Sequence, residues 1–324
     1  MRKKFDMTTR EDRKTVLVTG ASGYVASQML PEFRRRYELR LVDVTDHDRD
    51  GNLVEGVEVV DLIDPDRDHY RHLFEGVDAV VHLGYKHSRD GGADGEDMPQ
   101  LERFPVELEN VQMANNVYRT AFDAGVSRVV MASSNHAADW YEYTLVHSSK
   151  KDMVFPDELP LSNNFYGWSK GAYELLGFVY ACGAFGRKLE VVQVRIGAPR
   201  DTSGKHYDAG LDTLVEKHAE PQGPGMTTNL GLFKRDLGAH FSERDLTQLF
   251  RRAVDTDDIE DSHGIPWLIV YGISGNTRAF WSLENARRVL GYQPEDDSEV
   301  KYAADVQRLL TGHDANARKG RVGG

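Results

Sequence analysis

The sequence contains only one cysteine, Cys182, among its 324 residues. A single cysteine excludes an internal disulfide and a zinc site built on several cysteines, and it fits a reducing, cytoplasmic location. No apolar run is long enough to cross a bilayer, and the charged residues at the start have no apolar segment behind them that would form a secretory signal. We therefore expect no membrane partner.

Positive charge is also scarce, because 40 Lys and Arg residues stand against 52 Asp and Glu residues. The resulting net charge of −12 argues against nucleic acid as a partner. Two nearby histidines, His69 and His72, lack a third ligand, so we expect no metal site. The whole sequence is 40% hydrophobic and 28% charged, as is typical of a globular protein with a sizeable core.

Short β-branched runs alternate with longer helical patterns through the first two thirds of the chain. The strands are predicted at 15–19, 39–43, 57–61, 78–83, 127–133 and 189–196. The helices are predicted after the first strand to about residue 37, and at 66–75, 105–124 and 165–186. Uninterrupted apolar strands alternating with helices predict an α/β fold, a Rossmann-type doubly wound parallel sheet covered on both faces.

The pattern loosens after residue 196. Residues 199–240 are rich in Gly, Asp and Lys and show little periodicity, which predicts a long inserted loop. Order returns with helices at 243–254 and 283–290 and a strand at 267–272. We therefore expect three parts, which are a flexible tail at 1–13, a Rossmann domain with the catalytic helix at 14–196, and a small C-terminal substrate-binding cap at 197–324 that carries the loop 199–240.

A glycine-rich turn, VLVTGASGYVAS, connects the first predicted strand to its helix. Gly20 and Gly23 make this turn tight enough for backbone N–H groups and the helix N-terminus to face a pyrophosphate. The third position of the fingerprint is Ala26 rather than glycine, which weakens the match. Asp43 ends the second strand, where a carboxylate binds ribose hydroxyls and repels a 2′-phosphate, so NAD is favoured over NADP.

A tyrosine and a lysine stand four residues apart where the helix at 165–186 begins. Of the 14 tyrosines only Tyr166 has this spacing, which places its side chain beside Lys170 on one helix face. We expect the charge of Lys170, together with that of an oxidised nicotinamide, to lower the pKa of the phenol so that it accepts a proton. Ser134, after the fifth strand, is positioned to hold the substrate oxygen. The alternatives are a surface cation beside a half-buried ring and a serine that caps a turn.

The motifs TGASGYVA, Asp43, HLG, the serine pair and YGWSK resemble those of the extended short-chain dehydrogenase/reductase superfamily, from about residue 14 onward. The resemblance implies bound NAD, a Ser134–Tyr166–Lys170 triad, and a homodimer formed through the helices at 105–124 and 165–186. It also implies a set of cofactor contacts, with Asn110 at the position of the family's structural asparagine. The expected cofactor-binding residues are Gly20, Ser22, Gly23, Tyr24, Val25, Asp43, Asp61, Leu62, Leu83, Gly84, Asn110, Lys170 and Ile196.

Within that superfamily the sequence is most similar to uronate dehydrogenases, through ASSNH at 132–136, RIG at 195–197 and the C-terminal segment. The likeness implies oxidation of a sugar or uronic acid at the anomeric carbon to give a lactone. It also implies that Arg235 binds the substrate carboxylate, where the alternative is an exposed cation in a charged loop. The expected substrate-binding residues are His87, Ser134, Asn135, His136, Tyr166 and Arg235.

Four departures from that family leave the substrate open. The stretch from Ser134 to Tyr166 is long, residues 86–104 and 199–234 look like insertions, and Ala198 stands where a serine would follow RIG. A nucleotide-sugar epimerase or dehydratase with tightly bound NAD is the main alternative, although RIGAPR lacks its usual asparagine. A non-catalytic NAD-binding protein is the third interpretation, against which the intact Ser–Tyr–Lys set argues.

Overall fold

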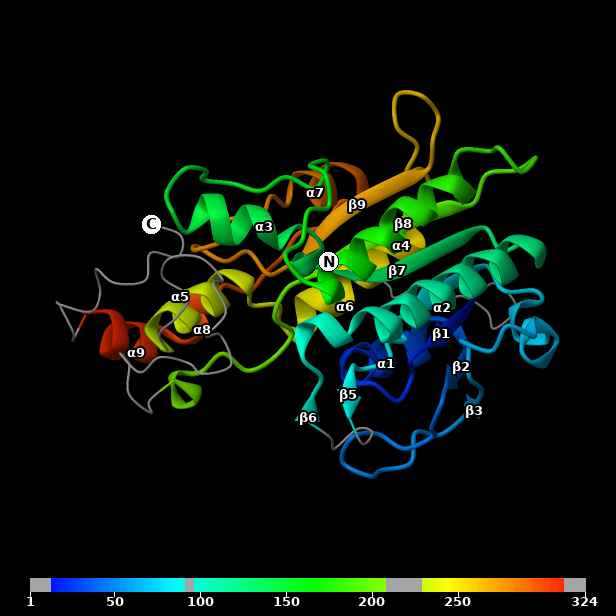
Figure 1. Ribbon diagram of the computed structural model, residues 1–324, viewed down its shortest axis with the longest axis horizontal. Coiled ribbons are helices and arrows are strands. Elements are labelled where there is room, and N and C mark those ends of the chain that lie inside the picture. Colours follow the sequence, from blue (N-terminus) through cyan, green and yellow to red (C-terminus); the bar gives the residue numbers. More distant parts are fainter. Residues whose placement is uncertain (1–12, 91–95, 208–228, 312–324) are drawn as a thin grey trace, which may run out of the picture.

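The computed structural model describes residues 13–90, 96–207 and 229–311. The predicted tail at 1–13 therefore lies almost wholly outside the described residues, as does the 208–228 part of the predicted inserted loop. Seven parallel strands form one sheet in the order β3-β2-β1-β4-β7-β8-β9, which confirms the predicted fold class (Figure 1). The strands are β1 (Thr15–Thr19), β2 (Glu38–Asp43), β3 (Val57–Val59), β4 (Ala79–His82), β7 (Arg128–Ser134), β8 (Glu190–Ile196) and β9 (Trp267–Gly272).

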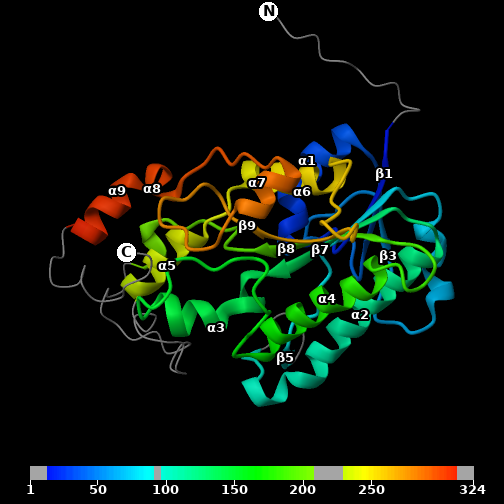
Figure 2. The ribbon, with the colours of Figure 1, turned by 90° about the horizontal axis from the view of Figure 1, so that it is seen from above.

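Helices cover both faces of this sheet. Figure 2 shows α1, α6 and α7 on one face and α2 and α4 on the other. Because both faces are covered, the central strands are apolar throughout, and Val16, Leu17 and Val18 are fully buried. The helices are α1 (Tyr24–Arg36), α2 (Phe104–Asp123), α4 (Phe165–Ala181), α6 (Glu243–Asp255) and α7 (Glu284–Leu290).

The strand order reverses between β1 and β4, and this reversal places the candidate site. The chain builds one half of the sheet outward from β1 and the other half outward from β4. Loops that leave the carboxyl ends of these two strands diverge to opposite faces and leave a crevice between them, where such folds bind nucleotides. The glycine turn follows β1, and Leu83 and Gly84 follow β4.

Two predicted helices differ from the structure. The helix at 66–75 is wrong, because this segment forms two short 3₁₀ turns, Arg67–His69 and Arg71–Phe74. The carboxylates of Asp64 and Asp66 accept local backbone N–H groups there, which favours turns over a continuous helix. The helix predicted to reach residue 186 ends at Ala181, because Gly183 follows in a left-handed conformation with φ of +83°.

The C-terminal third contributes both to the main sheet and to a separate cluster. Strand β9 pairs with β8, so the segment assigned to the cap also forms the edge of the main sheet. The domain boundary after residue 196 stays a prediction. Within the predicted loop 199–240 the structure has a helix, α5, whose Leu230, Phe233 and Leu237 pack with Tyr302 and Leu309. The cluster lies between α5 (Asn229–Ala239) and the segment that contains α8 (Ser298–Lys301), α9 (Ala303–Val306) and the turn Gln307–Thr311, at the left of Figure 1.

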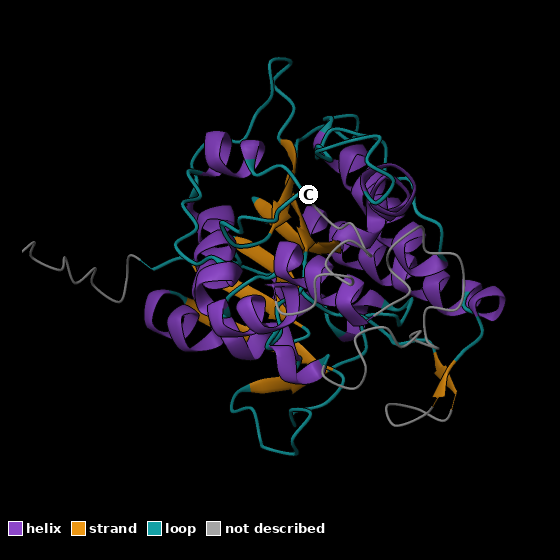
Figure 3. Ribbon diagram, turned by 90° about the vertical axis from the view of Figure 1, so that its left-hand side faces the viewer, coloured by secondary structure: helices purple, strands orange, loops and turns teal. Residues whose placement is uncertain are grey.

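The predicted insertion at 86–104 and the long stretch between Ser134 and Tyr166 both have structure of their own. Strands β5 (Arg89–Asp90) and β6 (Glu96–Asp97) form a small antiparallel ribbon that stands apart from the main sheet (Figure 3). The long stretch after β7 contains a turn at residues 135–138, the short α3 (Asp139–Tyr141) and a π-helical turn, Glu142–Val146. In the part of the chain that the structure describes, no helix is both long and apolar enough to cross a membrane.

Candidate active site

The turn after β1 passes so close to the end of β4 that only glycine fits. Gly20 has a φ of +68°, and a Cβ added there would lie 2.6 Å from the backbone nitrogen of Gly84. The backbone N–H of Leu83 donates to the carbonyl of Thr19 at 3.0 Å, which holds the two strand ends together. The missing side chain therefore leaves the crevice floor as bare backbone, as a pyrophosphate site requires.

The carboxylate of Asp43 closes one side of the same crevice. It accepts the backbone N–H of Ser22 at 2.9 Å and that of Val44 at 2.7 Å. Burial raises the pKa of Asp43 and these backbone hydrogen bonds lower it. A cavity of about 240 Å³ opens beside it, with apolar walls from the ends of β2, β3 and β4. It is lined by Gly20, Val42, Asp43, Val44, Val60, Asp61, Leu62, Ile63, Gly84, Tyr85, Lys86 and Met113.

These residues fit an NAD molecule. Gly23 caps the N-terminus of α1, a helix of 13 residues whose free N–H groups face the turn. Tyr24 lies under the guanidinium of Arg49 at 4.1 Å, and Val25 packs partly against the core. An apolar cavity, a carboxylate and a helix N-terminus thus lie together, and they suit a base, a ribose and a pyrophosphate respectively.

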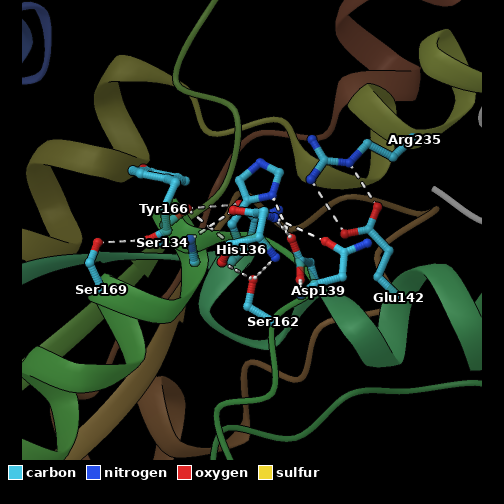
Figure 4. Close-up of polar contacts among 12 residues, drawn as sticks. Ser134, His136, Asp139, Glu142, Ser162, Tyr166, Ser169 and Arg235 are labelled. Carbon is cyan, nitrogen blue, oxygen red and sulfur yellow. Dashed lines mark hydrogen bonds and ion pairs between the residues drawn. The ribbon is translucent and has the colours of Figure 1, made fainter. Parts of the chain in front are cut away.

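Ser134 and Tyr166 lie together at the same edge of the sheet (Figure 4), and Lys170 contacts the strand that ends in Ser134. Ser134 is the last residue of β7, and its hydroxyl lies close enough to the phenol of Tyr166 on α4 to lower the pKa of that phenol. Lys170 is 4% exposed, and its Nζ donates to the carbonyl of Ala132 at 3.1 Å. Its Nζ lies 5.7 Å from the centre of the Tyr166 ring. Asn164 starts α4, since its Oδ1 accepts the N–H of Gly167 at 2.9 Å.

The electrostatics of the pair differ from the expectation. Burial raises the pKa of Tyr166, the hydrogen bond from Ser134 lowers it, and the charge of Glu107 raises it. Lys170 is not among the groups that shift this pKa, so the expected lowering by Lys170 is not found in the protein alone. Burial lowers the pKa of Lys170 to about 8, while the charges of Glu107 and Glu174 raise it. Desolvation, which a sequence does not display, decides both directions.

Glu107, a residue that sequence reasoning missed, lies buried behind Tyr166 and Lys170. Its carboxylate accepts the hydroxyl of Tyr85 at 2.5 Å and that of Ser169 at 2.6 Å. Tyr85 in turn packs edge-on against Tyr166, with ring centres 5.2 Å apart, and lies under Nζ of Lys170 at 4.9 Å. The only available signal was the placement of Glu107 one helical turn before Asn110.

The turn after β7 presents two polar side chains beside Tyr166. His136 has its ring centre 5.7 Å from that of Tyr166, and its Nδ1 contacts the buried carboxylate of Asp139 at 3.1 Å. Asp139 also accepts Nδ2 of Asn164 at 2.7 Å, which ties the turn to the start of α4. Asn135 is 1% exposed, and its Nδ2 has no hydrogen-bond partner among the described residues.

Arg235 lies on α5 and is buried rather than exposed. Its Nε and Nη2 donate to the carboxylate of Glu142 at 2.9 and 3.4 Å, and its Nη1 contacts Asp236 at 3.3 Å. The alternative of an exposed cation is wrong, since Arg235 is 5% exposed. In Figure 4 the ring of His136 lies between Tyr166 and the Arg235 guanidinium.

The remaining predicted residues lie around this centre. The amide of Asn110 holds the loop after β4, because it accepts the N–H of Lys86 at 2.8 Å and donates to its carbonyl at 2.9 Å. Ile196 ends β8 and pairs with Ser134 across the sheet. His87 is exposed, with its ring 5.0 Å from that of Tyr85. In the described part of the chain, no group of three or more His, Cys, Asp or Glu is arranged to hold a metal ion.

The fold and the crevice define a nucleotide-binding α/β protein of the Rossmann type. Residues 16–181 match the NAD dependent epimerase/dehydratase family. The chain belongs to this family of NAD-dependent enzymes. The cofactor expected from Asp43 and the glycine turn is therefore NAD.

Similar proteins include several sugar dehydrogenases. The chain is 31% identical over 294 residues to the NAD-dependent glucose-6-phosphate dehydrogenase of Haloferax volcanii, covering 87% of this chain and 94% of that protein. It is 31% identical to the uronate dehydrogenase of Pseudomonas syringae pv. tomato, covering 90% and 86%. It is 28% identical to the L-arabinose 1-dehydrogenase of Haloferax volcanii, covering 87% and 97%. Among solved structures, a mutated uronate dehydrogenase superposes with a TM-score of 0.64 at 26% identity, covering 91% and 86%.

Proposed function

We propose that the protein oxidises the anomeric hydroxyl of a free sugar or sugar acid to a lactone. The observation that carries this proposal is the convergence of Ser134, Tyr166 and Lys170 beside the NAD crevice. The similarity to glucose-6-phosphate, uronate and arabinose dehydrogenases supports a sugar as the substrate.

Each residue has a defined part in this reaction. Ser134 holds the anomeric oxygen, and the phenolate of Tyr166 takes its proton as the C–H bond breaks and the C=O bond forms. Bound NAD⁺ supplies the acceptor for the departing hydride, which carries both electrons. The buried charge of Lys170 stabilises the phenolate, opposing the desolvation that raises the pKa of Tyr166.

Two side chains of the turn after β7 are assigned to substrate hydroxyls. The buried Nδ2 of Asn135 can donate a hydrogen bond to a substrate hydroxyl, because it has no partner among the described residues. Leaving such a buried donor unsatisfied lowers the stability of the protein. His136 is held by Asp139 through Nδ1, which leaves Nε2 for a hydroxyl. A sugar, which carries several hydroxyls on one ring, would satisfy both.

We also propose a homodimer that covers α2 and α4. These helices pack against each other on one face of the sheet (Figure 2), and both of them expose large apolar side chains. The exposed apolar residues on them are Phe104, Leu108, Trp168, Leu175, Phe178 and Val179.

The proposal is tested by mixing the purified protein with NAD⁺ and following NADH absorbance. Free aldoses, uronic acids and nucleotide sugars are supplied separately. We expect stoichiometric NADH from a free sugar, with lactone as the product. Conversion of a nucleotide sugar into an isomer without accumulated NADH would instead identify an epimerase.

A further inference from the structure

A cluster of four charges, three of them buried, lies on the substrate side of the fold, beyond His136. Three nitrogens of the Arg235 guanidinium contact acidic side chains, two of them Glu142 and the third Asp236. The side chain of Glu142 is completely buried and that of Arg235 is 6% exposed. The Arg235 guanidinium also lies over the Trp281 ring, at 5.4 Å. All three nitrogens of the Arg235 guanidinium therefore already contact carboxylates of the protein itself.

The cluster is electrically balanced. Asp236 is shared, because it also accepts Nη2 of Arg200 and the hydroxyl of Tyr207, each at 2.7 Å. Two guanidinium groups thus face two carboxylates. Although burial raises the pKa of Glu142, the charge of Arg235 and the neighbouring His147 lower it to about 2, so the pair is ionised at neutral pH.

The position of Glu142 connects this cluster to the sugar site. Glu142 begins the π-helical turn that follows His136 and Asp139 in the same segment, and this segment starts directly after Ser134. His136 lies against Tyr166 at one end, and Glu142 holds Arg235 at the other (Figure 4). A sugar with its anomeric carbon at the Tyr166 phenol and its far end pointing past His136 would therefore approach the Arg235–Glu142 pair.

We propose that Glu142 is a built-in counter-ion for Arg235, so that the sugar site accepts an uncharged aldose and disfavours a uronic acid. This inference rests on the proposed function and names its substrate class. The carboxylate that a uronate would bring to Arg235 is already present as the Glu142 side chain. An incoming carboxylate would meet Glu142 and Asp236 as like charges and would have to displace charge-assisted hydrogen bonds. A hydroxymethyl group or a hydrogen at the same place meets neither obstacle.

The first test compares matched substrates that differ only in this group. kcat/KM is measured with NAD⁺ for glucose against glucuronate and for galactose against galacturonate, with glucose 6-phosphate added as a second anion. We expect the wild-type protein to favour the neutral member of each pair. In Glu142→Gln the ratio should move toward the uronate by about tenfold or more, because one charged acceptor has been removed from the guanidinium.

A matched control separates substrate preference from stability. Glu190→Gln removes the partner of another largely buried arginine, Arg128, at the opposite end of β7 and β8. This variant should lose stability without changing the ratio of the two substrates. A wild-type preference for glucuronate over glucose, or for glucose 6-phosphate over glucose, would overturn the inference, as would an unchanged ratio in Glu142→Gln.

The second test does not depend on turnover. Glu142→Gln leaves a buried guanidinium short of one counter-charge, so its Tm should fall. Glucuronate should raise the Tm of this variant relative to sodium chloride at equal ionic strength, and it should not raise that of the wild-type protein. Stabilisation of the wild type and not of the variant would overturn the inference. Absence of NADH with every sugar would refute the proposed function, while these Tm values would still decide the role of Glu142.

Discussion

Replacing Gly20 by alanine should damage both folding and cofactor binding, because two separate costs meet at this position. The residue adopts a φ of +68°, and the new Cβ would lie 2.6 to 2.9 Å from backbone atoms of Leu83 and Gly84. These atoms belong to the end of β4 and its loop, so they cannot rotate away as a side chain would. Relief requires the ends of β1 and β4 to separate, which is where the pyrophosphate is expected to bind.

The magnitude follows from adding these two costs. A left-handed conformation costs an alanine about 1–2 kcal/mol. Inserting a methyl group into a space without room costs about 1–3 kcal/mol more. The free energy of unfolding of Gly20→Ala should therefore fall by about 2–5 kcal/mol.

A second glycine provides a control in which alanine meets the left-handed conformation but no steric clash. Gly291 ends α7 with a φ of +63°, and a Cβ added there has no neighbour within 4 Å. Gly291→Ala should thus lose only about 1–2 kcal/mol. Both variants are unfolded in urea and titrated with NAD, and only Gly20→Ala should bind NAD more weakly than the wild type. Equal stability of the two variants, with unchanged NAD affinity, would refute the close approach of the two strand ends.

Two further predictions concern the catalytic edge. Tyr166→Phe should lower kcat by about 10²–10⁴-fold, since a general base is lost, while NAD affinity measured by titration stays close to that of the wild type; normal turnover would exclude the phenol as the base. His82 is buried behind the crevice, and burial with the nearby charge of Lys170 lowers its pKa from 6.5 to about 3. The unfolded chain therefore binds a proton that the folded protein excludes, so the free energy of unfolding should decline as pH falls from about 6.5 toward 3. Urea unfolding across this range should show a shallower decline in His82→Asn, and identical slopes would contradict the assignment.

Local patterns predicted the parts of the fold that have strong periodicity. Buried strands such as β1 and β8 are unbroken apolar runs, and their alternation with helices left few topologies to consider. Helix boundaries were less predictable where short-range polar contacts compete, as in the aspartate-rich turns at 64–68. Helix α5 was missed because its apolar residues, Leu230, Phe233 and Leu237, lie within a polar, glycine-rich region.

The residues of the candidate site also fall into two groups, those that the sequence predicted and those that only the structure revealed. The glycine turn and the Tyr166–Lys170 spacing each lie within a few consecutive residues, so the sequence alone predicts the chemistry that they support. The carboxylates around them are not, because their partners come from distant segments. Glu107 meets Ser169 across 62 residues, and Glu142 meets Arg235 across 93.

The sequence by itself thus determined the sheet and the cofactor, and it named a candidate proton acceptor, since each depends on residue types at short spacing. The tertiary structure alone decided how the charges are balanced. Burial, rather than Lys170, dominates the pKa of Tyr166. Arg235, which was expected to bind a substrate carboxylate, is already paired with the carboxylate of Glu142. Desolvation and ion pairing depend on which groups the fold excludes from water together, and spacing along the chain does not encode that.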